Sequence, residues 1–327
     1  MISYLQAILI GLLQGVTELF PISSLGHSVL VPALLGWHQV VASQSAQESF
    51  YLAFLVGLHV ATALALLWFY RHQWARIVVG LFRSLRKRRI TTADERLGWL
   101  LVVGTIPAGL VGIAFEHALR SLFAKPLAAA VFLTCNGVIL LAGERLRRRA
   151  VGRADRPGRV TLDAGPVARS SGGAAAIAGG AAPVPHAIPA GIPDGLDPPS
   201  RPLGTLGFGD ALLIGGAQIL AFFAGISRSG ATMVAGLARG LDHEDAAHLA
   251  FLLATPIILA AGLYKLPDFL GPNGDGVRGQ VLAGSVVAGL AAFLSVRFLT
   301  RYFRTRTLTP FAIYCLVVGV ACIIRFA

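Results

Sequence analysis

Six apolar runs constrain the fold of this chain more than any other feature of its sequence. A helix needs about 20 mostly apolar residues to cross the hydrocarbon core of a bilayer. Runs of about that length occur at 50–70, 97–115, 127–143, 246–266, 280–296 and 310–326. The whole chain is 55% hydrophobic and 13% charged, too few charges for the hydrated surface of a soluble domain. We therefore predict an all-α, polytopic membrane protein with six full transmembrane helices.

Two further apolar segments, 4–35 and 208–241, are interrupted near their middles by Pro, Gly, Ser and ionisable residues. Irregular backbone at membrane depth is tolerated only where it is buried in protein or lines a cavity. We expect each of these segments to form a broken, re-entrant helical hairpin.

The basic residues alternate between the segments that connect the predicted spans. Segments 71–96, 144–207 and 297–309 together hold 21 Lys and Arg residues, whereas 32–49, 116–126 and 267–279 hold 3. Loops that carry many Lys and Arg residues stay in the cytoplasm, which fixes the orientation of each span. The net charge of +12 is thus a topology signal, and we expect no nucleic-acid partner.

The chain contains a weak internal repeat. At an offset of 204 residues, seven of the 18 positions in 9–26 are identical to those in 213–230. The charge pattern gives the matching spans 50–70 and 246–266 opposite directions, which predicts an inverted-topology repeat. Such repeats place discontinuous helices near the midplane of the bilayer. We expect both termini outside the cytoplasm and the two broken segments to meet inside the membrane.

The repeat divides the chain into two membrane halves, 1–143 and 208–327, which form one membrane domain. Between them, 144–207 is rich in Ala, Gly, Pro and Arg and has no apolar period. That composition predicts a disordered cytoplasmic linker without a catalytic role.

The first broken segment carries an acid, hydroxyls and an imidazole. Gln14 and Glu18 are four residues apart, hence on one face of a helix, and the turn after Pro21 presents Ser23, Ser24 and His27. Ionisable groups at membrane depth are costly and mark functional sites. A purely structural pairing of Glu18 with His27 is the alternative.

The second broken segment carries a lone arginine among small residues. Ser227, Arg228, Ser229 and Thr232 combine a bidentate cation with hydroxyls and closely approaching backbone N–H groups, which suits a phosphate oxyanion. The alternative is an Arg228 that is buried only to pair with Glu18. Gln218, the repeat mate of Gln14, and His59 are candidates for a supporting shell.

These motifs resemble those of the undecaprenyl-diphosphatase family of the bacitracin-resistance type. Gln14-x-x-x-Glu18 resembles its (E/Q)xxxE motif, the stretch from Pro21 to His27 its PxSSxGH-like sequence, and the stretch from Ala224 to Thr232 its PGxSRSxxT motif. The resemblance covers both halves and omits only the linker. Gln14, Leu25 and Ala224 depart from the commoner residues, and Gln14 leaves Glu18 as the only carboxylate for a metal.

The resemblance implies hydrolysis of undecaprenyl diphosphate to undecaprenyl phosphate and inorganic phosphate, which recycles the lipid carrier of cell-wall synthesis. It implies a bacterial inner-membrane enzyme whose site faces outside and uses Mg²⁺ or Ca²⁺, with Glu18 and Gln14 as metal ligands. We call the interrupted middle of each broken segment its tip. Arg228 would bind the phosphoryl group together with hydroxyl groups of both tips, namely those of Ser23, Ser227, Ser229 and Thr232. Ser24 or His27 would attack, and we favour Ser24 with His27 as its base.

A secondary transporter or polyprenyl-lipid flippase is the alternative function, because inverted repeats with broken helices are typical of transporters. The two broken segments carry different groups, which favours the enzyme: the first carries the acid and the candidate nucleophiles, and the second carries the groups that would bind the anion. The sequence leaves the oligomeric state open, with a homodimer among the options.

Overall fold

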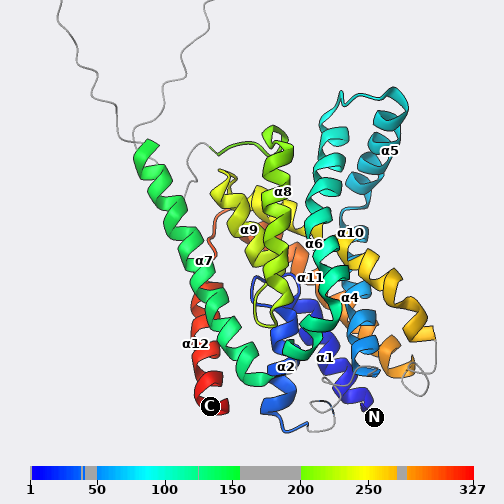
Figure 1. Ribbon diagram of the computed structural model, residues 1–327, viewed down its shortest axis with the longest axis vertical. Helices are drawn as coiled ribbons and strands as arrows, with labels where there is room; N and C mark the ends of the chain where they lie inside the picture. Colours follow the sequence, from blue (N-terminus) through cyan, green and yellow to red (C-terminus); the bar gives the residue numbers. More distant parts are fainter. Residues whose placement is uncertain (1, 38–39, 41–49, 124, 155–199, 271–277) are drawn as a thin grey trace, which may run out of the picture.

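The computed structural model describes residues 2–37, 40, 50–123, 125–154, 200–270 and 278–327. These residues form helices and connecting turns, with no strand among them. The two termini lie at one end of the molecule, and the C-terminal ends of α5 (Arg71–Lys87) and α7 (Pro126–Ala154) lie at the other (Figure 1).

Among the described residues, five helices are long and apolar enough to span a membrane, or six if one bent pair counts as a single span. The five are α6 (Ala93–Phe123), α7, α10 (His243–Leu270), α11 (Arg278–Tyr302) and α12 (Thr309–Phe326). The pair consists of α4 (Phe50–Phe69) and α5, which meet at an 87° bend. Each predicted span coincides with one of these helices, so the prediction of an all-helical, multi-pass membrane protein is confirmed. Many outward-facing side chains on these helices are large and apolar, such as Ile113, Val317 and Ile324, as expected of a lipid-facing surface.

Both interrupted segments are broken helices. The first consists of α1 (Tyr4–Thr17) and α2 (Ser24–Leu34), and the second of α8 (Phe208–Gly216), the 3₁₀ helix η2 (Ala217–Phe222) and α9 (Arg228–Ala238). Ser23 has a φ of 72° and caps α2, because its hydroxyl accepts a hydrogen bond from the Gly26 amide. Ser227 caps α9 in the same way through the Gly230 amide.

Glycines allow the broken helices to lie against long helices almost backbone to backbone. A Cβ atom on Gly11 of α1 would overlap the carbonyl oxygen of Gly284 on α11, and one on Gly215 of α8 would overlap that of Gly104 on α6. Gly11 and Gly215 are matching positions of the internal repeat. Small residues at helix crossings are how membrane helices reach such close packing.

The predicted linker differs from the structure at both of its ends. α7 continues to Ala154, and its buried Glu144 accepts a hydrogen bond from the Leu308 amide at 2.7 Å and lies 2.6 Å from Nε2 of His243. A short 3₁₀ helix, η1 (Leu203–Thr205), precedes the buried Leu206. Residues 144–154 and 200–207 therefore belong to the folded protein, because Glu144 bonds to the second half and Leu206 is buried. The rest of the linker lies outside the described residues.

The glycine crossings predict different effects for two adjacent substitutions in α8. Gly215→Ala forces α8 away from α6, and we expect it to lower stability by about 1–3 kcal/mol, as overpacking does. Gly216→Ala is the matched control, because a Cβ there meets no atom within 4 Å. Thermal unfolding of the purified proteins in detergent, followed by loss of the monodisperse size-exclusion peak, measures the difference. Equal midpoints for the two variants would contradict the close crossing.

Candidate active site

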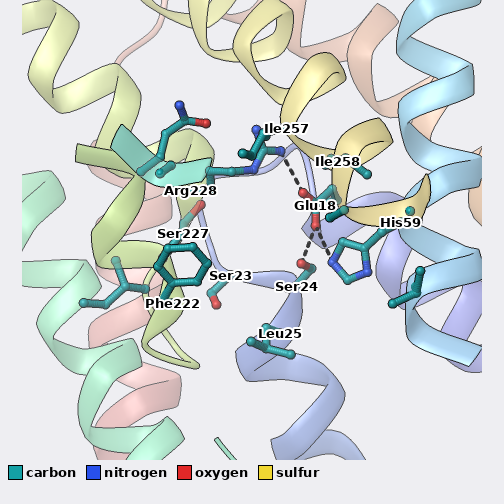
Figure 2. Close-up of a pocket in the computed structure, with 17 residues that line it drawn as sticks. Glu18, Ser23, Ser24, Leu25, His59, Phe222, Ser227, Arg228, Ile257 and Ile258 are labelled. Atoms are coloured by element: carbon teal, nitrogen blue, oxygen red, sulfur yellow. Dashed lines mark hydrogen bonds and ion pairs between the residues drawn. The ribbon is translucent and has the colours of Figure 1, made fainter. Parts of the chain in front are cut away.

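The tips of the two broken segments meet at an internal pocket of about 220 Å³ (Figure 2). Its polar lining comes from both tips, from α4 and from η2: Glu18, Ser23, Ser24, His59, Gln218, Ser227 and Arg228. The remaining wall is apolar and includes Val56, Ala108, Phe222 and Ile257. The pocket therefore joins a small polar end to a larger apolar surface.

The Glu18 carboxylate is the hub of the polar end, with its side chain 5% exposed. Arg228 donates from Nη2 to Oε1 of Glu18 at 2.7 Å. Oε2 accepts from the Ser24 hydroxyl at 2.5 Å and from Nε2 of Gln14 at 3.0 Å, and Nε2 of His59 lies 3.3 Å away. A carboxylate in an apolar interior is stable only when it is paired and hydrogen-bonded, and these four partners meet that need.

Arg228 has capacity to bind a further anion. It is the first residue of α9, and its side chain is 14% exposed at the pocket. Its Nη1 atom is buried and has no hydrogen-bond partner within the part of the chain that the structure describes. A guanidinium group binds phosphate through two parallel N–H groups, so an unused Nη1 beside a pocket suits an oxyanion.

The geometry does not support His27 as the base for Ser24. Its Nδ1 lies 2.7 Å from the Ser23 carbonyl oxygen, and its Nε2 lies 2.8 Å from the Tyr314 hydroxyl on α12. His27 also stacks on the Tyr314 ring and does not line the pocket. The ring is held from two sides, by the carbonyl oxygen of Ser23 one turn earlier and by Tyr314 on a helix far along the chain. Glu18, and not His27, contacts the Ser24 hydroxyl.

Two of the predicted phosphate ligands support the loops and do not line the pocket. The Ser229 hydroxyl contacts the Ser227 hydroxyl at 3.0 Å, and the Thr232 hydroxyl donates to the Arg228 carbonyl oxygen at 2.8 Å. Ser23 lines the pocket, but its hydroxyl also accepts from the Gly225 amide at 3.2 Å, which ties one tip to the other.

The predicted supporting shell consists of His59 and Gln218. His59 and Gln218 line the pocket, and Gln218 donates to the Gly104 carbonyl oxygen at 3.4 Å. Sequence reasoning missed two residues that contact the tips, Asn136 on α7 and Tyr314. Asn136 was detectable as a lone amide within a predicted span.

Two side-chain oxygens at the polar end, on Gln14 and Glu18, could act as ligands of a divalent cation. No group of three or more His, Cys, Asp or Glu side chains among the described residues could hold a metal ion by itself. The Oε1 atom of Gln14 is buried without a partner among those residues, and Oε1 of Glu18 accepts one hydrogen bond. Mg²⁺ keeps several waters and binds through one or two carboxylates plus phosphates, so two protein oxygens fit that mode.

Comparison with known proteins identifies the family. A family profile described as "Bacitracin resistance protein BacA" matches residues 7–179 and 194–321. The "Undecaprenyl-diphosphatase 2" of Frankia alni is 57% identical over 341 residues, which cover 100% of this chain and 98% of that protein. The "Undecaprenyl-diphosphatase" of Mycolicibacterium paratuberculosis is 55% identical, again over 100% and 98%. The "Undecaprenyl-diphosphatase 2" of Chromobacterium violaceum is 38% identical over 97% and 96%. This chain therefore belongs to the BacA family of bacitracin resistance proteins.

Proposed function

We propose that this protein is an undecaprenyl-diphosphatase, a membrane hydrolase that converts undecaprenyl diphosphate to undecaprenyl phosphate and inorganic phosphate. Its full-length relatives carry that name. The observation that supports it most directly is the contact of Ser24 and Arg228 with one buried carboxylate in a largely apolar pocket. The activity recycles the lipid carrier of cell-wall synthesis and fits the bacitracin-resistance family.

The two ends of the pocket match the two ends of such a substrate. Arg228 and the loop around Ser227 offer a positive, hydrogen-bonding surface for the diphosphate. Val56, Phe222 and Ile257 offer an apolar wall for the first part of the prenyl chain. The substrate would reach both ends of the pocket from the bilayer, in which its prenyl chain dissolves.

The short hydrogen bond between Ser24 and Glu18 supports a path for the proton. Ser24 attacks the terminal phosphorus, and its proton passes to Glu18, whose Oε2 is 2.5 Å away. The Ser24–phosphorus bond forms, and the bond from that phosphorus to the bridging oxygen breaks, which releases undecaprenyl phosphate as an anion. Water then attacks the phosphoserine, and Glu18 returns its proton to the departing Ser24 oxygen. Arg228 neutralises the charge on the phosphoryl oxygens in both steps.

A divalent cation, Mg²⁺ or Ca²⁺, is part of the proposal. Gln14 and Glu18 would contribute oxygen ligands, and the diphosphate and water would provide the rest. When bound, the cation neutralises negative charge on the diphosphate.

The finer topology is also a proposal: six full spans and two re-entrant hairpins, in inverted halves 1–143 and 208–327. The matched glycine crossings, Gly11 on Gly284 and Gly215 on Gly104, support it. With the basic loops in the cytoplasm, the site faces the outer side of the inner membrane. The linker has no part in the chemistry, and a homodimer remains open.

The same architecture favours one alternative, a transporter or flippase of polyprenyl lipids. Broken helices from two inverted halves that meet near the midplane are a transporter arrangement. The 2.5 Å contact between Ser24 and Glu18 favours the enzyme, because passage of a lipid needs no nucleophile beside a base. Release of inorganic phosphate by purified protein separates the two, since a pure transporter releases none.

Loss of the guanidinium fork tests the role of Arg228. Arg228→Lys keeps the charge but loses bidentate contact, so we expect turnover to fall by about 10²-fold to 10³-fold, the usual effect of one lost oxyanion contact. Phosphate release from undecaprenyl diphosphate in detergent measures it. Arg239→Lys on the same segment is the control, because Arg239 pairs with Asp210 and does not line the pocket. Normal turnover by folded Arg228→Lys protein would contradict this active site and favour the transporter.

Trapping the covalent intermediate tests the nucleophile. With substrate labelled in its terminal phosphate, acid quenching should leave label on the wild-type protein and none on Ser24→Ala. Turnover by Ser24→Ala should be abolished while substrate still binds, because the pocket wall is unchanged. A parallel quench in alkaline detergent preserves phosphohistidine, and label on the Ser24→Ala protein after that quench would instead make His27 the nucleophile.

Labelling of added cysteines tests the topology. In intact cells, a membrane-impermeant maleimide should label Ala327→Cys at the C-terminus, whereas Arg86→Cys on α5 should react only after permeabilisation. The unmodified chain gives the background from its own cysteines. The reverse pattern would contradict an outward-facing site.

A further inference from the structure

Asn136 is a fully buried amide in the middle of a membrane helix. It lies on α7, within the span Pro126–Arg149, and its side chain is 0% exposed. An amide in such surroundings is costly unless its donors and acceptor are satisfied. Its hydrogen bonds therefore indicate what it stabilises.

The amide bridges the two broken segments. Its Nδ2 donates to the Pro21 carbonyl oxygen at 2.9 Å and lies 3.3 Å from the Cys315 sulfur, and its Oδ1 accepts from the Ser227 amide at 3.0 Å. The orientation of the amide follows from these partners, because a carbonyl can only accept and a backbone N–H can only donate. One side chain thus satisfies a backbone group of each tip.

Both bridged groups lie within three residues of the reacting side chains along the chain. Pro21 lies between Glu18 and Ser24, and Ser227 is the N-cap that immediately precedes Arg228. Asn136 itself does not line the pocket. It can therefore affect the reaction only through the positions of the two tips.

We propose that Asn136 is a positioning residue that clamps the two tips together, so that Arg228 and Ser24 face the same phosphoryl group. This inference rests on the proposed diphosphatase activity. Asparagine suits the position because it presents a donor and an acceptor side by side. Leucine and alanine both leave the two backbone groups unpaired; leucine keeps a similar side-chain size, whereas alanine also leaves a gap.

The decisive experiment compares Asn136→Leu and Asn136→Ala with the wild-type protein in detergent. We expect kcat to fall by about 10²-fold, the effect of misplacing catalytic groups by about 1 Å, while KM changes little. Thr134→Val is the matched control, because the Thr134 hydroxyl on the same helix donates only to the Ala130 carbonyl oxygen within α7. An equal loss of kcat in Thr134→Val would show a general packing effect and overturn the proposal.

A double-mutant cycle separates positioning from simple destabilisation. If Asn136 acts through the tip that carries Arg228, Asn136→Leu should reduce turnover much less in an Arg228→Lys protein than in the wild type. Independent, multiplicative losses in the double variant would overturn the proposal.

Hydrogen exchange gives a readout that needs no activity. Asn136→Leu should speed the exchange of the peptide that contains the Ser227 amide, and Thr134→Val should not. Unchanged exchange would overturn the clamp, whichever reaction the protein catalyses. If the wild-type protein releases no phosphate and Asn136→Leu still exchanges faster, the proposed function is wrong, but the positioning role of Asn136 stands.

Discussion

The ion pair between Glu18 and Arg228 is the interaction on which the rest of the structure depends. Its partners lie 210 residues apart in the chain and 2.7 Å apart in space. Neither charge could remain alone at membrane depth, since an unpaired buried charge is strongly destabilising. Each broken segment therefore provides the partner that the other needs, and the two halves of the chain must come together at their tips.

Such close contact between tips requires small residues on both sides. A Cβ atom added to Gly26 would lie 2.8 Å from Cα of Gly225 and 3.2 Å from the Ser23 hydroxyl oxygen. Gly225 itself has a φ of 118°, a conformation that side chains with a Cβ rarely adopt. The glycines of the tips and those of the helix crossings thus meet the same requirement, which is backbone approach inside a medium without water.

The helices and several of the polar residues that line the pocket could be predicted from the sequence, whereas the directions of other side chains could not. Spans follow from apolar length alone, and Glu18, Ser24 and Arg228 were recognisable as polar residues in apolar surroundings. Whether His27 points to Ser24 or to Tyr314 depends on a helix 287 residues away. The helical continuation of α7 past Glu144 was hidden by its polar composition, because its partners His243 and Leu308 lie far along the chain.

The pairing of Arg228 with Glu18 has a consequence for turnover. A carboxylate that occupies the guanidinium acts as a tethered competitor of every phosphate that enters or leaves the pocket. In the proposed reaction, the diphosphate meets the unused Nη1 first, and it would have to displace the carboxylate from Nη2 to gain bidentate contact, which would weaken binding of the ground state. After hydrolysis the same carboxylate, always at high local concentration, can displace the free phosphate ion and hasten its escape. In the proposed reaction, Glu18 would thus serve twice, as the group that takes up the proton and as the group that displaces the product.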